Sequence, residues 1–470
     1  MGKITVVGLG LSKGDITLSA LNVIKSGVKL IARTSLAVSY NQVTDLVGEV
    51  PSLDFVYKKS RNFDTLNKNL AKAVIGEAKT GDVAYLVDGS AVEDNSVLEI
   101  IKKHDNVEII AGVSAGAKCL ENVKAVESGY TVISAYDVGY LKVATYPLIV
   151  YAIDTRQTAS NVKLILSDLV GEETTVTISS TNGVKEIKLY ELDRQEYYGY
   201  DFSLYIKKQP LTKKSRFDFL DLIEVLENLR GENGCPWDKA QTPKSVEKNL
   251  IEETYELIDA IEEGDDDKII EETGDVLLQA AFEIIFGVER GAFTLSDVLT
   301  GICYKLISRH THVFGEDTAT DANSALDVWN KNKAVEKGYE TGADYLKAVP
   351  RNFPSVMRAE KVGSRAGKYN LDFSTVEETF IKLDEEVNEL KTAVKLGDKE
   401  EIKKECGDLL FTAVNVLRKL GVDGETSLNA TTDKFIKRFE KTESLILNDG
   451  KNIKNLTANE VDCYYRKSKE

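Results

Sequence analysis

An internal repeat in the second half of the chain is the feature that most restricts its fold. When the sequence is shifted by 133 residues, positions 252–280 align with 385–413 without a gap and share 13 identities over 29 positions. Unrelated segments of that length would share about two. The shared residues include paired acids and a Gly-Asp break, so this half of the chain contains two copies of one folded unit.

The repeated unit predicts a helical hairpin with an acidic face. Each copy reads Glu-Glu-x-x-Glu, then a Gly-Asp break, then Glu-x-Gly-Asp at the start of an apolar run. Side chains three positions apart on a helix are separated by about 60° around its axis. Glu253 therefore lies beside Glu256, and Glu272 lies beside Asp275. A turn at Gly264 lets the two helices run antiparallel, so we expect four carboxylates to converge in each copy of an all-α half.

Two features favour a built site over the ordinary alternative, in which acid pairs on helices are solvated and face lysines. The acids recur at identical spacing, while surface positions differ between the copies: Lys268 stands against Glu401, and Glu271 against Lys404. The second acid pair of each copy also opens the most apolar helix. A convergent set of carboxylates must protonate or bind cations. Oxygen ligands suit hard ions such as Mg²⁺ or Mn²⁺.

The composition of the chain narrows the classes of site and partner. Three histidines and five scattered cysteines, with no Cys-x-x-Cys pair, disfavour a histidine or thiolate metal site and fit a reducing cytoplasm. The net charge of −16 falls wholly in residues 216–470, which hold 35 basic and 51 acidic residues. An acidic half of this kind argues against nucleic acid as a partner. No apolar run approaches the ~20 residues that cross a bilayer, so we expect no membrane partner.

A Lys/Arg pair follows each set of acids. Lys305 and Arg309 follow the first set, and Lys434 and Arg438 follow the second. Residues four apart share one face of a helix. Cations near metal-holding acids are typical of sites that hold a polyphosphate. The alternative is that each pair forms surface salt bridges.

Several motifs in this half, taken in order, resemble the MazG family of nucleoside triphosphate pyrophosphohydrolases. A Gly-Cys-Pro-Trp-Asp-Lys-Ala-Gln-Thr segment at 234–242 precedes the first acids, and an Arg-His-Thr-His-Val-Phe segment at 309–314 follows them. The resemblance runs through both repeats. It implies a helical bundle that forms a homodimer through the repeats and binds a nucleoside triphosphate through Mg²⁺. The implied products are a nucleoside monophosphate and pyrophosphate.

The same resemblance assigns roles to individual residues. The implied metal ligands are Glu253, Glu256, Glu272 and Asp275 in the first copy, and Glu386, Glu389, Glu405 and Asp408 in the second. Glu252 and Glu385 would orient or deprotonate the attacking water. The implied substrate contacts are Lys305, Arg309, Trp329, Lys333, Lys434 and Arg438. Trp329 has the alternative of packing between helices, and in the second copy Tyr465 and Lys469 are the nearest match to Trp329 and Lys333.

Residues 1–206 predict an α/β domain with a mostly parallel sheet, because short β-rich runs alternate with helical stretches. The candidate strands are Ile4–Val7, Val28–Ile31, Val83–Val87, Val107–Ile110, Leu148–Ile153 and Thr174–Ile178. Glycine-containing segments after the first, third and fourth of these runs resemble the tetrapyrrole methylase family. That resemblance implies S-adenosylmethionine as a cofactor. It assigns cofactor binding to Gly10, Asp88, Gly89, Val113, Ser114 and Ala115, although Leu11-Ser12-Lys13 stands where the family has a proline.

These expectations define the domain organisation and the function. We expect a methylase-like domain at 1–208, a linker at 209–218, the first repeat at 219–335, a connecting segment at 336–355 and the second repeat at 356–470. The expected function is cytoplasmic, Mg²⁺-dependent hydrolysis of nucleoside triphosphates. In the alternative, the methylase-like domain transfers methyl groups, and the helical half is a dimerisation scaffold or a nucleotide sensor without turnover.

Overall fold

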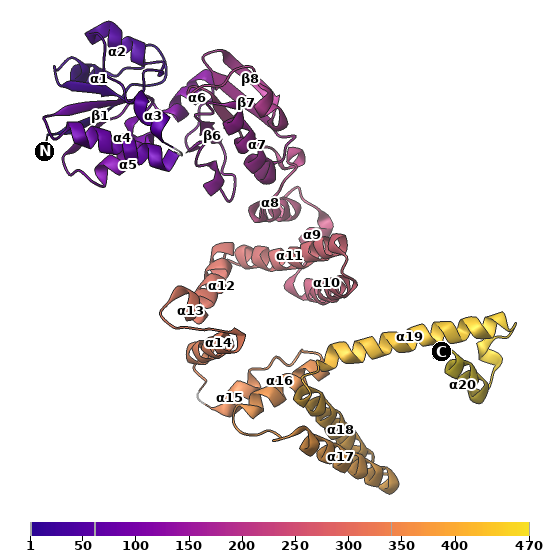
Figure 1. Cartoon of the computed structure of the whole chain (residues 1–470). Helices are drawn as coiled ribbons and strands as arrows, with labels where there is room; N and C mark the ends of the chain where they lie inside the picture. Colours follow the sequence, from indigo (N-terminus) through magenta and orange to yellow (C-terminus); the bar gives the residue numbers. More distant parts are fainter. Residues whose placement is uncertain (1, 61–62, 340, 470) are drawn as a thin grey trace. The chain divides into compact units, whose positions relative to one another are not determined.

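The computed structural model describes residues 2–60, 63–339 and 341–469 (Figure 1). The chain divides into two compact units, Met1–Leu295 and Ser296–Glu470. The first unit contains two β-sheets and the helical hairpin of the first repeat. The second unit is helical and contains the second repeat. Within the described ranges, no helix is long and apolar enough to cross a membrane.

The first sheet is fully parallel and has helices on both faces. Its strands run in the order β2 (Lys29–Ala32), β3 (Val83–Val87), β1 (Ile4–Gly8) and β4 (Val107–Ile110). One face packs on α3 (Asp54–Lys59), α4 (Phe63–Glu77) and α5 (Asn95–Ile101), and the other packs on α1 (Leu18–Ile24) and α2 (Tyr40–Val47). Strands β1 and β3 are buried along their whole length. Their continuous apolar sequences follow from burial on both faces.

The second sheet is mixed. Its strands run in the order β5 (Thr131–Ser134), β6 (Leu148–Tyr151), β9 (Ser203–Ile206), β7 (Thr175–Ser180) and β8 (Gly183–Lys188). Only β5 and β6 pair in parallel; the other pairs are antiparallel. Helix α7 (Arg156–Val170) packs on its main core, and α6 (Ala115–Val123) packs on a smaller apolar cluster. Short 3-10 turns occur at η1 (Ala91–Glu93), η2 (Val138–Tyr140) and η3 (Leu189–Arg194).

All the candidate strands from the sequence are present, but they belong to two sheets. The expectation of an α/β domain with parallel pairing is confirmed by the first sheet. The strands β5, β8 and β9 were not predicted. β8 is mostly exposed and polar, so it lacks the apolar run that marks a buried strand. Its pairing with β7 comes from the tight turn at residues 181–182, which only an antiparallel hairpin can use.

The character of the chain changes after β9, where strands stop and helices follow. The turn η4 (Leu211–Lys213) leads to α8 (Phe219–Arg230), α9 (Pro236–Ala240), α10 (Pro243–Glu263) and α11 (Asp266–Glu289). Helices α8, α10 and α11 enclose a small apolar core that includes Leu226, Val246 and Phe282. Helices α10 and α11 pack along each other as the predicted hairpin.

The second unit begins within α12 (Leu295–Arg309) and is all helical in its described residues. The following helices are α13 (Thr311–Phe314), α14 (Ala322–Lys337), α15 (Gly342–Lys347), α16 (Ser355–Gly367), α17 (Val376–Leu396), α18 (Lys399–Lys419), α19 (Gly424–Asn448) and α20 (Ala458–Lys467), with the turn η5 (Ile453–Asn455) before the last. Helices α17 and α18 form the second hairpin, and α16 packs against α18. An all-α half is confirmed.

Candidate functional site

The two hairpins are made by the same local signals. In the first, the Thr242 side chain caps α10, and Gly264 ends that helix with φ of 70°. Asp265 then accepts hydrogen bonds from the backbone of Asp267 (3.1 Å) and Lys268 (3.3 Å), which starts α11. A glycine with positive φ is the usual end of a helix, and an aspartate is a preferred N-cap. The reversal of direction therefore falls where the sequence predicts it.

The second hairpin repeats these signals position by position. Thr375 caps α17, and Gly397 ends it with φ of 75°. Asp398 caps α18 by accepting from the backbone of Glu400 (3.1 Å) and Glu401 (3.3 Å). The two copies thus present their acids from helices that meet in the same way.

The first hairpin brings three of its four predicted metal ligands together. Oxygen atoms of Glu253, Glu272 and Asp275 all lie within 4.8 Å of one another, and the three side chains are half-buried. Burial and the neighbouring charges of Asp275, Glu256 and Glu272 raise the pKa of Glu253. Burial, and next Glu256, raise the pKa of Glu272. Glu256 is therefore close enough to add charge to the site without joining the three-residue cluster.

The second hairpin brings together the equivalent three acids. Oxygen atoms of Glu386, Glu405 and Asp408 lie within 4.8 Å of one another. Glu386 and Glu405 are both 5% exposed and so are more buried than Glu253 and Glu272, whereas Asp408 is exposed. Burial and the charges of Glu405 and Glu386 raise the pKa of Glu389, which places it beside the cluster as Glu256 lies beside the first.

The second site also contains two lysines that were not predicted from the sequence. Lys404 was expected to be a variable surface residue, and Lys382 was not among the candidates. Lys382 Nζ lies 2.9 Å from Glu386 Oε1, and Lys404 Nζ lies 3.1 Å from Glu405 Oε1. The other oxygen of Glu405, Oε2, is buried and has no hydrogen-bond partner. A signal was present in the sequence: Lys382 precedes Glu386 by four positions, the spacing of a helical ion pair.

The candidate water-activating residues are each paired with a lysine. Glu252 is exposed, and Lys248 lies 2.9 Å from its Oε1. Glu385 is also exposed and lies 2.9 Å from Lys382. Glu252 and Glu385 are each adjacent in sequence to a member of an acid cluster, and each side chain contacts a lysine.

Arg309 is the most buried of the candidate phosphate contacts. It is 4% exposed, and its guanidinium donates two hydrogen bonds to Glu336, at 2.7 and 2.9 Å. The same guanidinium lies 5.0 Å above the ring of Trp329, whose other neighbour is His310 at 4.7 Å. Burial, and next Arg309, lower the pKa of Lys333. Arg309, Trp329 and Lys333 are thus brought together. Trp329 packs between the side chains of Arg309 and His310, as expected for the alternative in which it is a packing residue.

The remaining candidate phosphate contacts lie on other surfaces. Lys305 is half-buried on α12. Lys434 and Arg438 lie on α19, where with Lys437, Lys441 and Ser468 they line a hollow of about 420 Å³. Among the residues that the structure describes, no ion pair joins Lys434 or Arg438 to the acids of the second hairpin.

The part of the first unit that contains the two sheets has a cavity of about 390 Å³. Half of the predicted cofactor residues line this cavity. Asp88, Gly89 and Ala115 line it; Gly10, Val113 and Ser114 do not. Burial raises the pKa of Asp88 to about 6, and Ser39 donates a hydrogen bond to it (3.2 Å). The sequence did not indicate the other side of the cavity, where Arg33, Tyr136, Tyr151 and Tyr200 come from separate strands and loops.

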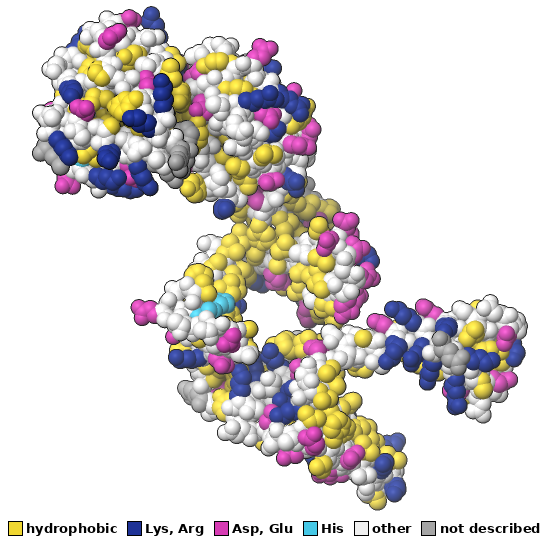
Figure 2. All heavy atoms as spheres, viewed as in Figure 1, with side chains coloured by type: hydrophobic (Ala, Val, Ile, Leu, Met, Phe, Trp, Pro, Cys, Tyr) yellow, Lys and Arg dark blue, Asp and Glu magenta, His cyan; other side chains and the backbone are white. Residues whose placement is uncertain are grey.

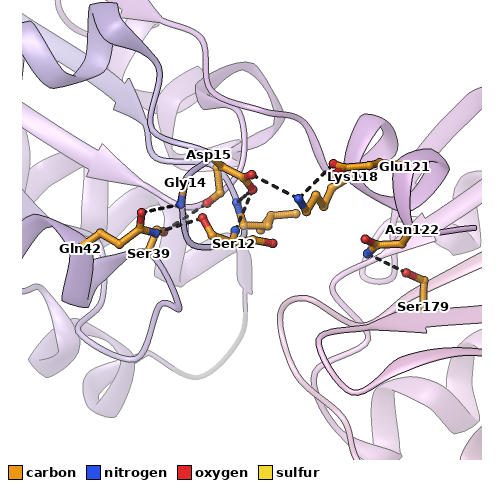
Figure 3. Close-up of polar contacts among 11 residues, drawn as sticks. Ser12, Gly14, Asp15, Ser39, Gln42, Lys118, Glu121, Asn122 and Ser179 are labelled. Carbon is orange, nitrogen blue, oxygen red and sulfur yellow. Dashed lines mark hydrogen bonds and ion pairs between the residues drawn. The ribbon is translucent and has the colours of Figure 1, made fainter. Parts of the chain in front are cut away.

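The first glycine loop is held by polar contacts within it and with neighbouring segments (Figure 3). Gly10 and Gly89 exchange two backbone hydrogen bonds of 3.0 Å, which join the first and third strand loops. Asp15 accepts from the backbone of Leu11 (3.1 Å) and Ser12 (2.8 Å), and Lys118 donates to it (3.2 Å). Ser114 instead caps α6, by accepting from Ala117. Gly10 and Ser114 therefore do not line the cavity but support residues that do: Gly10 is hydrogen-bonded to Gly89, and Ser114 precedes Ala115.

Both acid clusters fit a hard divalent cation. Every donor is a carboxylate oxygen, which is the ligand type that Mg²⁺ and Mn²⁺ prefer. Burial, and next the neighbouring acids, raise the pKa values of Glu253, Glu272 and Glu389, as expected where like charges lie close together. The unpartnered Oε2 of Glu405 offers a further free ligand atom.

A duplicated acidic helix hairpin of this kind defines a class of helical proteins suited to binding a metal ion. Comparison with known proteins makes the class specific. The MazG nucleotide pyrophosphohydrolase domain matches residues 241–314 and 374–442, which contain both acid sets. The YabN protein of Bacillus subtilis is 31% identical over all of this chain and 99% of its own length. The nucleoside triphosphate pyrophosphohydrolase/pyrophosphatase MazG of Thermotoga maritima is 40% identical over 55% of this chain and 98% of its own length. The chain belongs to the MazG family.

Solved structures align with the N-terminal part. A uroporphyrin-III-C-methyltransferase of Thermus thermophilus covers 44% of this chain and 95% of its own, at 16% identity and a TM-score of 0.34. A precorrin-6Y methylase of Archaeoglobus fulgidus covers 44% and 99%, at 14% identity and a TM-score of 0.32.

Proposed function

We propose that the chain hydrolyses nucleoside triphosphates to nucleoside monophosphates and pyrophosphate at its helical hairpins. One observation carries this function: two sets of three carboxylates, each within 4.8 Å, occur at matching positions of a duplicated unit. Family membership supports hydrolysis over the alternative of a purely structural helical half. The relatives named nucleoside triphosphate pyrophosphohydrolases also include a protein of Escherichia coli, 36% identical over 48% of this chain.

Mg²⁺ would be held by Glu253, Glu256, Glu272 and Asp275 in the first site, and Mn²⁺ is the closest substitute. In the second site the ligands would be Glu386, Glu389, Glu405 and Asp408. When bound, the ion neutralises phosphate charge and makes a water molecule more acidic. The half-buried setting of the acids strengthens their hold on a cation, since fewer waters screen the charges.

The neighbouring acids would handle the proton of the attacking water. Glu252 and Glu385 are the proposed bases, and a lysine lies 2.9 Å from each of them. The water oxygen would form a bond to the α- or β-phosphorus as that atom's bond to the bridging oxygen breaks, which separates the nucleoside monophosphate from pyrophosphate. The cationic groups Lys305, Arg309, Lys333, Lys434 and Arg438, with Trp329, are the proposed substrate contacts. Arg309 would have to leave Glu336 to reach a phosphate.

Removal of one carboxylate from each site tests this function. Glu253→Gln and Glu386→Gln, alone and together, keep the side-chain volume and remove one charge from each three-residue cluster. We expect the double variant to lose Mg²⁺-dependent hydrolysis, whereas Glu262→Gln, on the exposed side of α10, should retain it. Full activity in the double variant would exclude both sites. Tight nucleotide binding by the wild type with no product would instead support the sensor.

We propose a homodimer formed through the repeats. Apolar side chains are exposed at equivalent positions of the two hairpins: Ile261 (57%) with Val394 (57%), and Leu277 (44%) with Leu410 (68%). Figure 2 shows hydrophobic surface along both helical regions. Repeated exposure of this kind is typical of faces that another chain covers. Sedimentation equilibrium of the wild type and of Ile261→Gln/Leu410→Gln tests it: a monomeric wild type would contradict the proposal.

The N-terminal cavity is the basis of a second candidate activity, methyl transfer from S-adenosylmethionine. Asp88, Gly89 and Ala115 line a cavity large enough for a small organic molecule. Calorimetric titration of the intact chain with S-adenosylmethionine tests this, and Gly89→Val should abolish binding by filling the cavity wall. No binding by the wild type would remove the cofactor from the proposal.

The domain bounds and the compartment are part of the same proposal. A methylase-like domain at 1–208 and a linker at 209–218 fit the end of the last strand, β9, and the start of α8. The repeats at 219–335 and 356–470, joined by 336–355, remain proposals that limited proteolysis can test. Five free cysteines support a reducing, cytoplasmic location.

A further inference from the structure

The two acid sites differ in the cations that surround them. At the positions equivalent to Lys382 and Lys404, the first repeat has Asn249 and Glu271. At these two positions the second repeat carries two positive charges where the first has a neutral and a negative residue, whereas the first has lysines at 248 and 268 where the second has Ile381 and Glu401. This difference lies inside an alignment whose acidic residues are identical.

Both lysines contact the carboxylates that would hold a metal. Lys382 Nζ is 2.9 Å from Glu386 Oε1 and also 2.9 Å from Glu385. Lys404 Nζ is 3.1 Å from Glu405 Oε1. The side chains of Glu386 and Glu405 are 6% exposed, whereas those of the lysines are 36% and 62% exposed. The lysines therefore reach in from the surface and act as counter-ions for buried charge, which would otherwise be costly.

Among the described residues of the first site, no lysine forms an ion pair with Glu253, Glu272 or Asp275. The nearby lysines pair elsewhere, Lys248 with Glu252 (2.9 Å) and Lys268 with Glu263 (2.6 Å). Glu271 adds a negative charge next to Glu272, and Lys268 offsets part of the charge there without pairing directly with Glu272. A bare divalent cation entering the first site meets no ammonium group that is ion-paired with a cluster acid, whereas one entering the second must displace or approach two.

We propose that Lys382 and Lys404 are resident counter-ions of the second site, so that a free divalent cation loads the first site before the second. This inference rests on the proposed function, because it takes the two acid clusters as metal sites. Its consequence is that the second site is pre-neutralised. A metal that arrives there alone binds weakly, and both lysines become free for an anionic ligand only when a cation replaces them.

Titration of the intact chain with Mn²⁺, followed by water proton relaxation, measures the two sites without any activity. Glu386→Gln/Glu405→Gln leaves the first site, Glu253→Gln/Glu272→Gln leaves the second, and the quadruple variant provides the background. We expect the first site alone to bind Mn²⁺ at least about tenfold more tightly than the second alone, the effect of one strong charge interaction. Equal affinities, or tighter binding by the second site, would overturn the inference.

Lysine variants provide a test that leaves every proposed ligand in place. In the chain that keeps only the second site, Lys382→Gln/Lys404→Gln should raise Mn²⁺ affinity about tenfold. Lys395→Gln, an exposed position near the end of α17, should not change it. In the chain that keeps only the first site, Asn249→Lys should weaken binding. Unchanged Mn²⁺ affinity in the lysine variants would contradict the inference about loading order but not the proposed hydrolysis. Mn²⁺ binding to neither site would contradict both the inference and the proposed hydrolysis.

Discussion

Glu253 and Asp275 lie on different helices, α10 and α11, yet their carboxylate oxygens approach within 4.8 Å. Glu272 completes the cluster, and Glu256 lies near it. Two or more ionised carboxylates at this separation repel one another, so the folded chain holds a charge arrangement that an isolated helix would avoid. The same arrangement recurs between α17 and α18.

Glu253→Gln should stabilise the metal-free protein at pH 7. Burial and neighbouring acids raise the pKa of Glu253 in the folded chain, so folding favours its protonated form. Stability from this group is therefore present below the ordinary glutamate pKa and is lost as pH rises through the folded value. In EDTA, calorimetry should show a higher melting temperature for Glu253→Gln than for wild type at pH 7, and no difference at pH 4.

Mg²⁺ should reverse that order. An ion that binds only the folded chain stabilises it in proportion to the logarithm of its concentration. The melting temperature of the wild type should rise with added Mg²⁺, while that of Glu253→Gln/Glu386→Gln should stay near its EDTA value. An equal rise in both proteins would show that the ion acts at some other place.

The hairpin glycines should respond to alanine with opposite signs. Gly264 has φ of 70°, and a Cβ there would meet nothing within 4 Å, so Gly264→Ala should cost only the backbone strain, about 1 kcal/mol. Gly274 is helical and equally open, so Gly274→Ala should stabilise by about 0.5–1 kcal/mol. Urea unfolding of the two variants measures both effects. Destabilisation by Gly274→Ala would mean that other atoms pack against this position of the helix, in contradiction to the open space around it.

Loss of the Glu336 charge should destabilise the second unit. Arg309 is 4% exposed and donates two hydrogen bonds to Glu336, whose side chain is 36% exposed. Glu336→Gln leaves a buried guanidinium with a weaker partner, which should cost about 1–3 kcal/mol. Glu316→Gln, on an exposed turn, is the control. If denaturant unfolding shows both variants at wild-type stability, Arg309 is satisfied by other groups.

The repeat made the acidic hairpins predictable, because identical spacing carries both the helix period and the turn. Glu253 with Glu272, and Glu386 with Glu405, were expected to converge and do so. The lysine contacts were harder to foresee: Lys404 reads as a variable surface residue, and its role depends on the side chain reaching Glu405. The position of Lys404 in the sequence does not show that its side chain contacts Glu405.

Non-local pairing limited what the sequence could predict in the first unit. Strand β9 lies between β6 and β7, so its partners are decided by the folding of the whole lobe. The cavity shows the same limit. Asp88 and Gly89 belong to a recognisable glycine motif, but Tyr200 joins them from a distant loop that carries no pattern.

The most direct test of the account is the identity of the products. The intact chain is incubated with Mg²⁺ and each of the ribo- and deoxyribonucleoside triphosphates, and the products are separated by anion-exchange chromatography or assigned by phosphorus NMR. The account predicts equal amounts of nucleoside monophosphate and pyrophosphate from at least one substrate, lost in Glu253→Gln/Glu386→Gln. Nucleoside diphosphate with orthophosphate, or turnover that survives the double variant, would contradict it.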